Sequence, residues 1–238
     1  MIKKITKWLL NNQVLSVPRM YVGKALVDYY RDKGMTLISI YSKSPKFFDL
    51  VRKIKEKTEM RLSGLDAYHI YTIVKKTEKI EGHIAEVGVY KGGSAKLIRA
   101  ATKKPIHLFD TFEGLPDLSK YDSADKFYKG KYFASFESVK SYLNKYPNFY
   151  FYKGIFPSTA RPIKDKRFSF VHLDVDIYES TVNCLKFFYP RMNRGGCIIS
   201  HDYPDSKGVK KAFDEFFEDK PEIIIEPFGT GQSLIVKV

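Results

Sequence analysis

Two patterns of apolar residues divide the chain near residue 80. Before that point apolar residues recur at helical spacing, as in Phe47, Val51 and Ile54. After it, short apolar runs alternate with amphipathic stretches, a pattern typical of strands that alternate with helices. We therefore predict an N-terminal helical lobe over residues 1–80 and an α/β domain over residues 81–238.

The apolar runs of the second part predict seven strands. They cover residues 83–87, 105–109, 149–152, 168–173, 197–200, 222–225 and 232–236. Helical stripes lie between most of these runs, but no helix separates the last two. Strands joined through helices form a parallel sheet, whereas two strands without a helix between them pair antiparallel. The expected fold is a doubly wound, mostly parallel, seven-stranded Rossmann-like sheet with an antiparallel last strand.

The composition excludes several classes of protein. The chain has 238 residues, of which 44% are hydrophobic and 29% charged, as in ordinary globular proteins. It has no run of 18 apolar residues, and its two cysteines are too few for a disulfide framework. The apolar run at Trp8–Leu10 is shorter than a secretory signal requires. We expect a cytoplasmic protein without a transmembrane segment.

The net charge leaves several partners open. Lys and Arg number 41 against 27 Asp and Glu, which gives a formal charge of +14. A nucleic acid, an anionic membrane or an acidic substrate fits this charge, and so do lysines that only face solvent. Ile2, Ile5, Trp8 and Leu9 fall at helical spacing, so a peripheral membrane contact is a further possibility.

A glycine-containing turn follows the first predicted strand. Gly88 and Gly92 would let a ligand approach the backbone, and helix amides follow them. Their spacing matches neither G-x-G-x-x-G nor a P-loop. Asp110 ends the second strand 22 residues after Gly88, where an acidic side chain can accept hydrogen bonds from a ribose. Together they favour an adenosine-containing ligand; the alternatives are a turn without ligand and a local cap by Asp110.

Acidic residues follow the fourth and fifth predicted strands. Asp174 and Asp176 come after the fourth, and His201 and Asp202 after the fifth. The carboxyl ends of parallel strands meet at one edge of a sheet, so these side chains should lie together. Asp174, His201 and Asp202 would suit a divalent cation, and Asp176 could take a proton from a substrate hydroxyl. The alternative is that the aspartates only cap helices and turns.

Four segments in this order resemble the macrocin-type sugar O-methyltransferases: residues 86–94, 109–116, 172–181 and 195–203. That family contains class I S-adenosylmethionine-dependent enzymes that methylate sugar hydroxyls, usually with magnesium. The resemblance covers about residues 60–238. It implies a class I methyltransferase fold and S-adenosylmethionine as cofactor.

The resemblance also implies roles for single residues. The implied cofactor-binding residues are Glu86, Gly88, Val89, Tyr90, Lys91, Gly92, Ser94, Asp110, Thr111, Phe112, Gly154 and Asp174. The implied metal ligands are Asp174, His201 and Asp202, with Mg²⁺ as the expected ion, and the catalytic residues are Asp174 and Asp176. His201 stands where the family has a carboxylate, and an imidazole suits magnesium less well. Tyr90 and Lys91 replace the family's usual Trp-Arg pair.

The expected acceptor is a sugar, a glycan or a sugar phosphate. Residues 117–135 form a long polar connection that mixes aromatic residues with Lys126, Lys129 and Lys131. Such a segment is either a substrate lid or a plain surface loop, and its lysines favour an anionic acceptor. We expect a homodimer. We also expect no nucleic-acid partner, because the Asn/Asp-Pro-Pro-Tyr/Phe motif typical of base methylation is absent. An RNA methyltransferase and a catalytically degenerate binding subunit are the alternatives.

Overall fold

The computed structural model describes residues 44–238. The predicted membrane-contact residues Ile2, Ile5, Trp8 and Leu9 lie outside this part of the chain. The chain divides into two units, Met1–Phe48 and Asp49–Val238, and the second contains the whole sheet. The boundary predicted at residue 80 stays a prediction. No helix in residues 44–238 is both long and apolar enough to cross a membrane.

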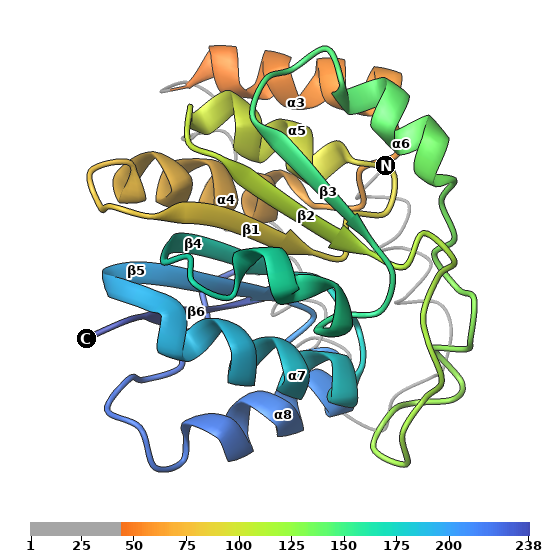
Figure 1. The fold of residues 1–238 in the computed structure, drawn as a ribbon, viewed down its shortest axis with the longest axis vertical. Coiled ribbons are helices and arrows are strands. Elements are labelled where there is room, and N and C mark those ends of the chain that lie inside the picture. The colour runs from red at the N-terminus through yellow and green to blue at the C-terminus, as the bar shows by residue number, and fades with distance from the viewer. Residues whose placement is uncertain (1–43) are drawn as a thin grey trace, which may run out of the picture. The chain divides into compact units, whose positions relative to one another are not determined.

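A single sheet forms the centre of the second unit, with the strand order β3-β2-β1-β4-β5-β6 (Figure 1). The strands are β1 His83–Val87, β2 Ile106–Asp110, β3 Phe149–Lys153, β4 Phe168–Leu173, β5 Met192–His201 and β6 Gln232–Val236. Strands β1 to β5 are parallel, and β6 pairs antiparallel with β5. The predicted α/β class, the mostly parallel sheet and the antiparallel last strand are confirmed.

The predicted strand over residues 222–225 is wrong, so the described sheet has six strands rather than seven. In this run Ile225 makes a single bridge, to Leu234. Burial alternates along this run, but with the polarity reversed, because the polar Glu222 is buried while the apolar Ile223 is 74% exposed. The Glu222 carboxylate turns inward to Lys237, whose Nζ lies 2.6 Å from Oε1.

Helices cover both faces of the sheet (Figure 1). The α-helices of residues 44–238 are α3 Pro45–Lys57, α4 Gly64–Thr77, α5 Gly93–Ala101, α6 Phe136–Leu143, α7 Tyr178–Phe188 and α8 Lys207–Phe217. Helices α4 and α5 pack against each other, as do α7 and α8. A reciprocal capping box, in which Ser63 and Asp66 bond each other's backbone amides, fixes the start of α4.

An aromatic core fills the space between the sheet and helices α7 and α8. Phe109, Phe168, Phe188 and Phe213 are fully buried in it. Burying each such ring contributes roughly 1.5–3 kcal/mol, which makes this layer rigid. The loops that leave the strands at their carboxyl ends are therefore built on a fixed base.

Candidate active site

A cavity of about 290 Å³ opens at the carboxyl ends of the parallel strands. Its walls come from the segments that follow β1, β2, β3, β4 and β5, and from residues 59–62 ahead of α4. Ligands of open α/β sheets bind at this edge. The sheet therefore brings together the glycine turn, Asp110 and the acidic segments that the sequence singled out.

The glycine turn after β1 contains one close approach between backbones, at Gly88, and positive φ angles at Gly88 and Gly92. Gly88 has φ +88°, and a Cβ there would lie 1.9 Å from the carbonyl oxygen of Asp174. Gly92 has φ +79° and begins α5 without a side-chain cap. Gly93 and Ser94 border the cavity, so the first amides of α5 are available to an anionic group such as a carboxylate.

Asp110 holds the turns on both sides of it. Its Oδ2 accepts hydrogen bonds from the amides of Val89 and Tyr90 at 2.7 and 2.8 Å, and its Oδ1 accepts one from Phe112 at 2.7 Å. Burial raises the pKa of Asp110, which these amides partly offset. Thr111 Oγ1 also lies 3.5 Å from Oδ1, so each of the about four acceptor sites of this carboxylate has a donor nearby in the chain. The ribose contact of Asp110 stays a prediction.

Most of the predicted cofactor-binding residues border the cavity. Those that do are Gly88, Val89, Tyr90, Ser94, Asp110, Thr111, Gly154 and Asp174. Glu86, Lys91, Gly92 and Phe112 do not. Lys91 instead forms an ion pair with Glu59, at 2.7 Å.

Glu86 lies fully buried in β1, beside His172 of β4. Its Oε1 is 2.8 Å from His172 Nδ1, while its Oε2 has no hydrogen-bond partner. Burial raises the pKa of Glu86. Glu86 does not border the cavity, so the fit to a ligand with an amino-acid end, as S-adenosylmethionine has, rests on the open helix amides at the strand ends.

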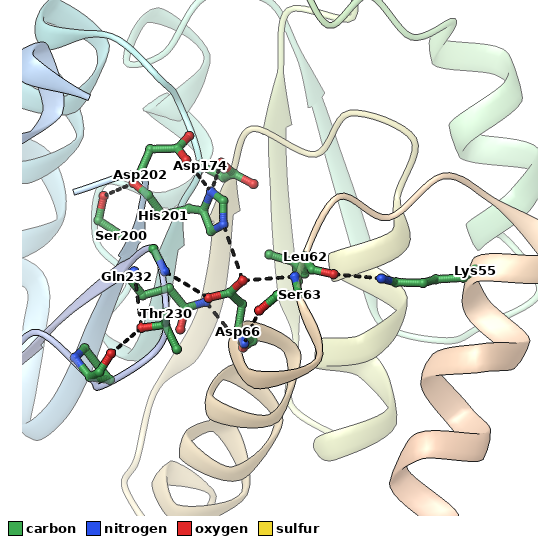
Figure 2. Close-up of polar contacts among 12 residues, drawn as sticks. Lys55, Leu62, Ser63, Asp66, Asp174, Ser200, His201, Asp202, Thr230 and Gln232 are labelled. Atoms are coloured by element: carbon green, nitrogen blue, oxygen red, sulfur yellow. Dashed lines mark hydrogen bonds and ion pairs between the residues drawn. The ribbon is translucent and has the colours of Figure 1, made fainter. Parts of the chain in front are cut away.

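The acidic segments form a cluster around the ring of His201, drawn in Figure 2. His201 Nδ1 lies 2.9 Å from Asp202 Oδ1 and 3.5 Å from Asp174 Oδ1. On the other side of the ring, Nε2 lies 3.9 Å from Oδ2 of Asp66 in α4. Sequence analysis missed Asp66, although the Ser63-x-x-Asp66 spacing marks a helix start; its contact with His201 depends on the packing of α4.

The charges of this cluster shift the pKa values in opposite directions. Burial opposes an imidazolium, but Asp174, Asp202 and Asp66 together outweigh burial and raise the pKa of His201 far above its usual value. Burial likewise opposes the ionised form of Asp174, and the positive charge of His201 outweighs it, so the pKa of Asp174 falls. Asp176 behaves differently, because burial and the neighbouring Asp174 and Asp202 raise its pKa well above the usual range.

Backbone strain concentrates around the cavity. Among the described residues, six non-glycine residues have positive φ, and four of them border the cavity: Tyr90, Tyr132, Asp176 and Asp202. Each such residue costs roughly 1–3 kcal/mol and keeps this conformation only because its surroundings enforce it. Asp176 is held in part by Ser206, whose Oγ donates a hydrogen bond to the Asp176 carbonyl at 2.9 Å.

The segment 117–135 is tied to the sheet edge. Phe127 packs with Leu115 and Ile177 in a small separate core. Asp122 Oδ1 accepts a hydrogen bond from the amide of Tyr178 at 2.8 Å and so caps the start of α7. Tyr132, close to the end of the segment, borders the cavity. Sequence analysis did not single out Asp122, whose role depends on a helix 56 residues away.

The predicted metal ligands do lie together, but their arrangement does not fit a hard divalent cation. Donor atoms of Asp174, His201 and Asp202 all fall within 4.8 Å of one another. Both ring nitrogens of His201, however, point at carboxylates, and a nitrogen that carries a proton toward a carboxylate has no lone pair for a metal. Magnesium also prefers oxygen ligands. The presence of a metal stays a prediction.

The chain is similar to known O-methyltransferases. The family model described as Macrocin-O-methyltransferase (TylF) matches residues 59–228. An 8-demethyl-8-(2,3-dimethoxy-alpha-L-rhamnosyl)-tetracenomycin-C 4'-O-methyltransferase of Streptomyces olivaceus is 29% identical over 159 residues, or 60% of each chain. A demethyldecarbamoylnovobiocin O-methyltransferase of Streptomyces niveus is 26% identical over 153 residues, or 58% of each. The chain thus matches less than two thirds of the length of these relatives.

The fold has solved counterparts. The structure of the O-methyltransferase NovP superposes with a TM-score of 0.62 and 23% identity, covering 72% of this chain and 79% of that one. At this identity the likeness concerns the fold alone. The family model spans the glycine turn, Asp110 and the acidic cluster, and on that match the chain belongs to the macrocin O-methyltransferase family.

Proposed function

We propose that the protein is an S-adenosylmethionine-dependent O-methyltransferase that acts on a hydroxyl of a sugar. The observation that carries the proposal is the position of Asp176, a buried carboxylate with a raised pKa in the wall of the same cavity as the glycine turn. A base with such a pKa can accept the proton of a hydroxyl and keep it. The glycine turn forms another part of the cavity wall and suits the cofactor.

Different residues of this chain bind the cofactor, orient the acceptor and take its proton. When bound, S-adenosylmethionine would supply an electrophilic methyl group, and breaking its S–CH₃ bond would leave S-adenosylhomocysteine. The first amides of α5 would hold the carboxylate of the ligand, and Asp110 keeps the glycine turn in the shape that exposes them. Asp174, with its lowered pKa, stays ionised and orients the acceptor hydroxyl, while Asp176 takes the hydroxyl proton as the oxygen attacks.

The acceptor is proposed to be a sugar that carries an anionic group, such as a sugar phosphate. The ring of Tyr132 borders the cavity and can stack on a sugar. Two cations lie over this ring, the Arg61 guanidinium at 5.2 Å and Lys131 Nζ at 4.8 Å from its centre. Arg61 pairs with Glu59 at 3.3 Å and Lys131 donates to the Lys126 carbonyl, so a phosphate would have to compete with these contacts. Arg61 and Lys131 are proposed as its partners because they lie over the ring that borders the cavity. A rhamnosyl acceptor in the name of one relative supports the sugar class.

Methyl transfer tests the proposal. The full chain is incubated with S-adenosylmethionine and either dTDP-rhamnose or a neutral rhamnosyl glycoside, and the methylated product is identified by mass spectrometry. Asp176→Asn should lower kcat by roughly 100- to 10,000-fold, the usual contribution of a general base, without weakening S-adenosylhomocysteine binding. Asp165→Asn is the matched control, because this exposed residue precedes β4 at the opposite edge of the sheet.

Three results would contradict the proposal. Cofactor binding without transfer to any sugar would indicate a binding subunit, and transfer to RNA would indicate a different substrate class. Full activity of Asp176→Asn would remove this residue from the reaction. The homodimer and the cytoplasmic location remain proposals, which light scattering on the purified chain and cell fractionation test separately.

A further inference from the structure

Three carboxylates from three separate elements converge on one imidazole. Asp66 comes from α4, Asp174 follows β4 and Asp202 follows β5, and His201 lies between them (Figure 2). Asp202 and Asp174 face Nδ1, and Asp66 faces Nε2. Each nitrogen of the ring thus faces a carboxylate.

The cluster needs a positive charge to be stable. Like charges that meet in a partly buried site repel strongly unless a cation lies among them. Within residues 44–238, the ion pairs of these three carboxylates all run to His201, and none runs to a lysine or an arginine. The remaining contacts of Asp66 are with amides, those of Ser63 at 2.9 Å and Gly231 at 3.2 Å. Amide dipoles alone do not neutralise three carboxylates.

The carboxylates on the two sides of the ring favour a proton on each of its nitrogens. A neutral imidazole has one N–H and one lone pair, and a lone pair that faces a carboxylate is repelled. An imidazolium has two N–H donors, which matches one acceptor on each side. Its neighbours act in the same direction, since Asp174, Asp202 and Asp66 favour the charged form of the ring.

We infer that His201, held as an imidazolium, is the built-in cation of this acidic cluster and takes the place of a bound divalent metal ion. The role of His201 in the reaction rests on the proposed function, whereas its replacement of a metal ion does not. His201 is a positioning residue, because its Nδ1 faces Asp202 and Asp174 and its Nε2 faces Asp66 rather than a substrate. It fixes these carboxylates beside Asp176 and leaves Asp176 as the group that exchanges a proton.

The charge at position 201 therefore decides whether the cluster takes a metal. His201→Asp replaces a positive charge by a negative one and places four carboxylates around the same space. Such a set attracts Mg²⁺ or Mn²⁺, which prefer oxygen ligands. His201→Asn is the matched control, because it removes the positive charge and adds no carboxylate.

Metal binding is the decisive measurement. The full-length wild type, His201→Asp and His201→Asn are treated with EDTA, dialysed, and titrated with MgCl₂ and MnCl₂ in a calorimeter, with thermal unfolding followed in parallel. We expect no binding and no rise in Tm for the wild type and for His201→Asn. His201→Asp should bind one ion per chain, and its Tm should rise by several degrees with the added metal, because a ligand that binds the folded state stabilises it.

A direct view of the ring accompanies the titration. In ¹⁵N spectra of the wild type, both ring nitrogens of His201 should show the shifts of N–H groups at neutral pH, and added Mg²⁺ should leave them unchanged. Stoichiometric binding of Mg²⁺ or Mn²⁺ by the wild type, or a neutral ring in these spectra, would overturn the inference. If His201→Asp does not fold, the wild-type titration and the ring spectra decide alone.

The two proposals fail in different ways. If the wild type binds a metal and methylates a sugar, the inference is wrong and the proposed function stands. If the wild type binds no metal and also methylates no sugar, the proposed function is wrong and the inference stands. If methyl transfer by the wild type survives EDTA while that of His201→Asp comes to require added Mg²⁺, both hold.

Discussion

Gly88 provides a sharp test of how the site is built, because the backbone that follows β4 passes where a side chain on this residue would lie. A Cβ on Gly88 would lie 1.9 Å from the Asp174 carbonyl oxygen, about 1.1 Å inside the 3.0 Å limit that real contacts respect. Ladder bonds hold both backbones, since the Asp174 amide bonds Val87 and the Gly88 amide bonds Phe109, each at 2.9 Å. Neither strand end can give way without losing a hydrogen bond.

The matched substitution at Gly130 separates strain from crowding. Gly130 has φ +84°, nearly that of Gly88, but a Cβ there would meet its nearest neighbour at 3.9 Å. Gly130→Ala should therefore cost roughly 1–2 kcal/mol of unfolding free energy, the cost of a left-handed backbone for alanine. Gly88→Ala carries the same cost plus roughly 1–3 kcal/mol for the forced backbone shift.

Urea denaturation and calorimetry with S-adenosylhomocysteine measure both effects. We expect the unfolding free energy of Gly88→Ala to be lower than that of Gly130→Ala by the roughly 1–3 kcal/mol of the backbone shift. Gly88→Ala should also lose cofactor affinity, because the turn and Asp174 move apart. Gly130→Ala should keep its affinity. Equal stability of the two variants, together with unchanged affinity of Gly88→Ala, would refute the close approach as the reason for glycine at this position.

Three further predictions concern other parts of the site. Asp122→Ala removes the cap of α7, so it should cost about 1 kcal/mol in urea denaturation and speed proteolysis within residues 117–135, whereas unchanged cleavage would show that the cap does not fix this segment. Because the raised pKa of Asp176 belongs to a base that works ionised, kcat/KM should fall as pH decreases through a midpoint above the ordinary carboxyl value, and a profile flat down to the ordinary value would contradict this role. Burial raises the pKa of Cys197 to about 11, so this thiol should react with iodoacetamide in urea but hardly at neutral pH in the native protein; rapid native labelling would contradict its burial.

Local patterns determined which elements form and where their functional ends lie. Apolar runs alternating with helical stripes predicted β1 to β5 and β6, because period and burial act over a few residues. The glycine turn and Asp110 were found in the same way, since both sit at the ends of predicted strands. The run 222–225 misled the prediction, because Glu222 finds its partners Tyr189 and Lys237 only in the folded chain.

Tertiary structure decided the chemistry of the acidic cluster. The sequence placed Asp174, His201 and Asp202 at neighbouring strand ends, and it favoured a metal because three such groups usually need a cation. The packing of α4 brings a third carboxylate, Asp66, to the far side of the His201 ring, so the ring can itself be that cation. A charge state depends on every group within a few ångströms, and 135 residues of chain separate these two side chains.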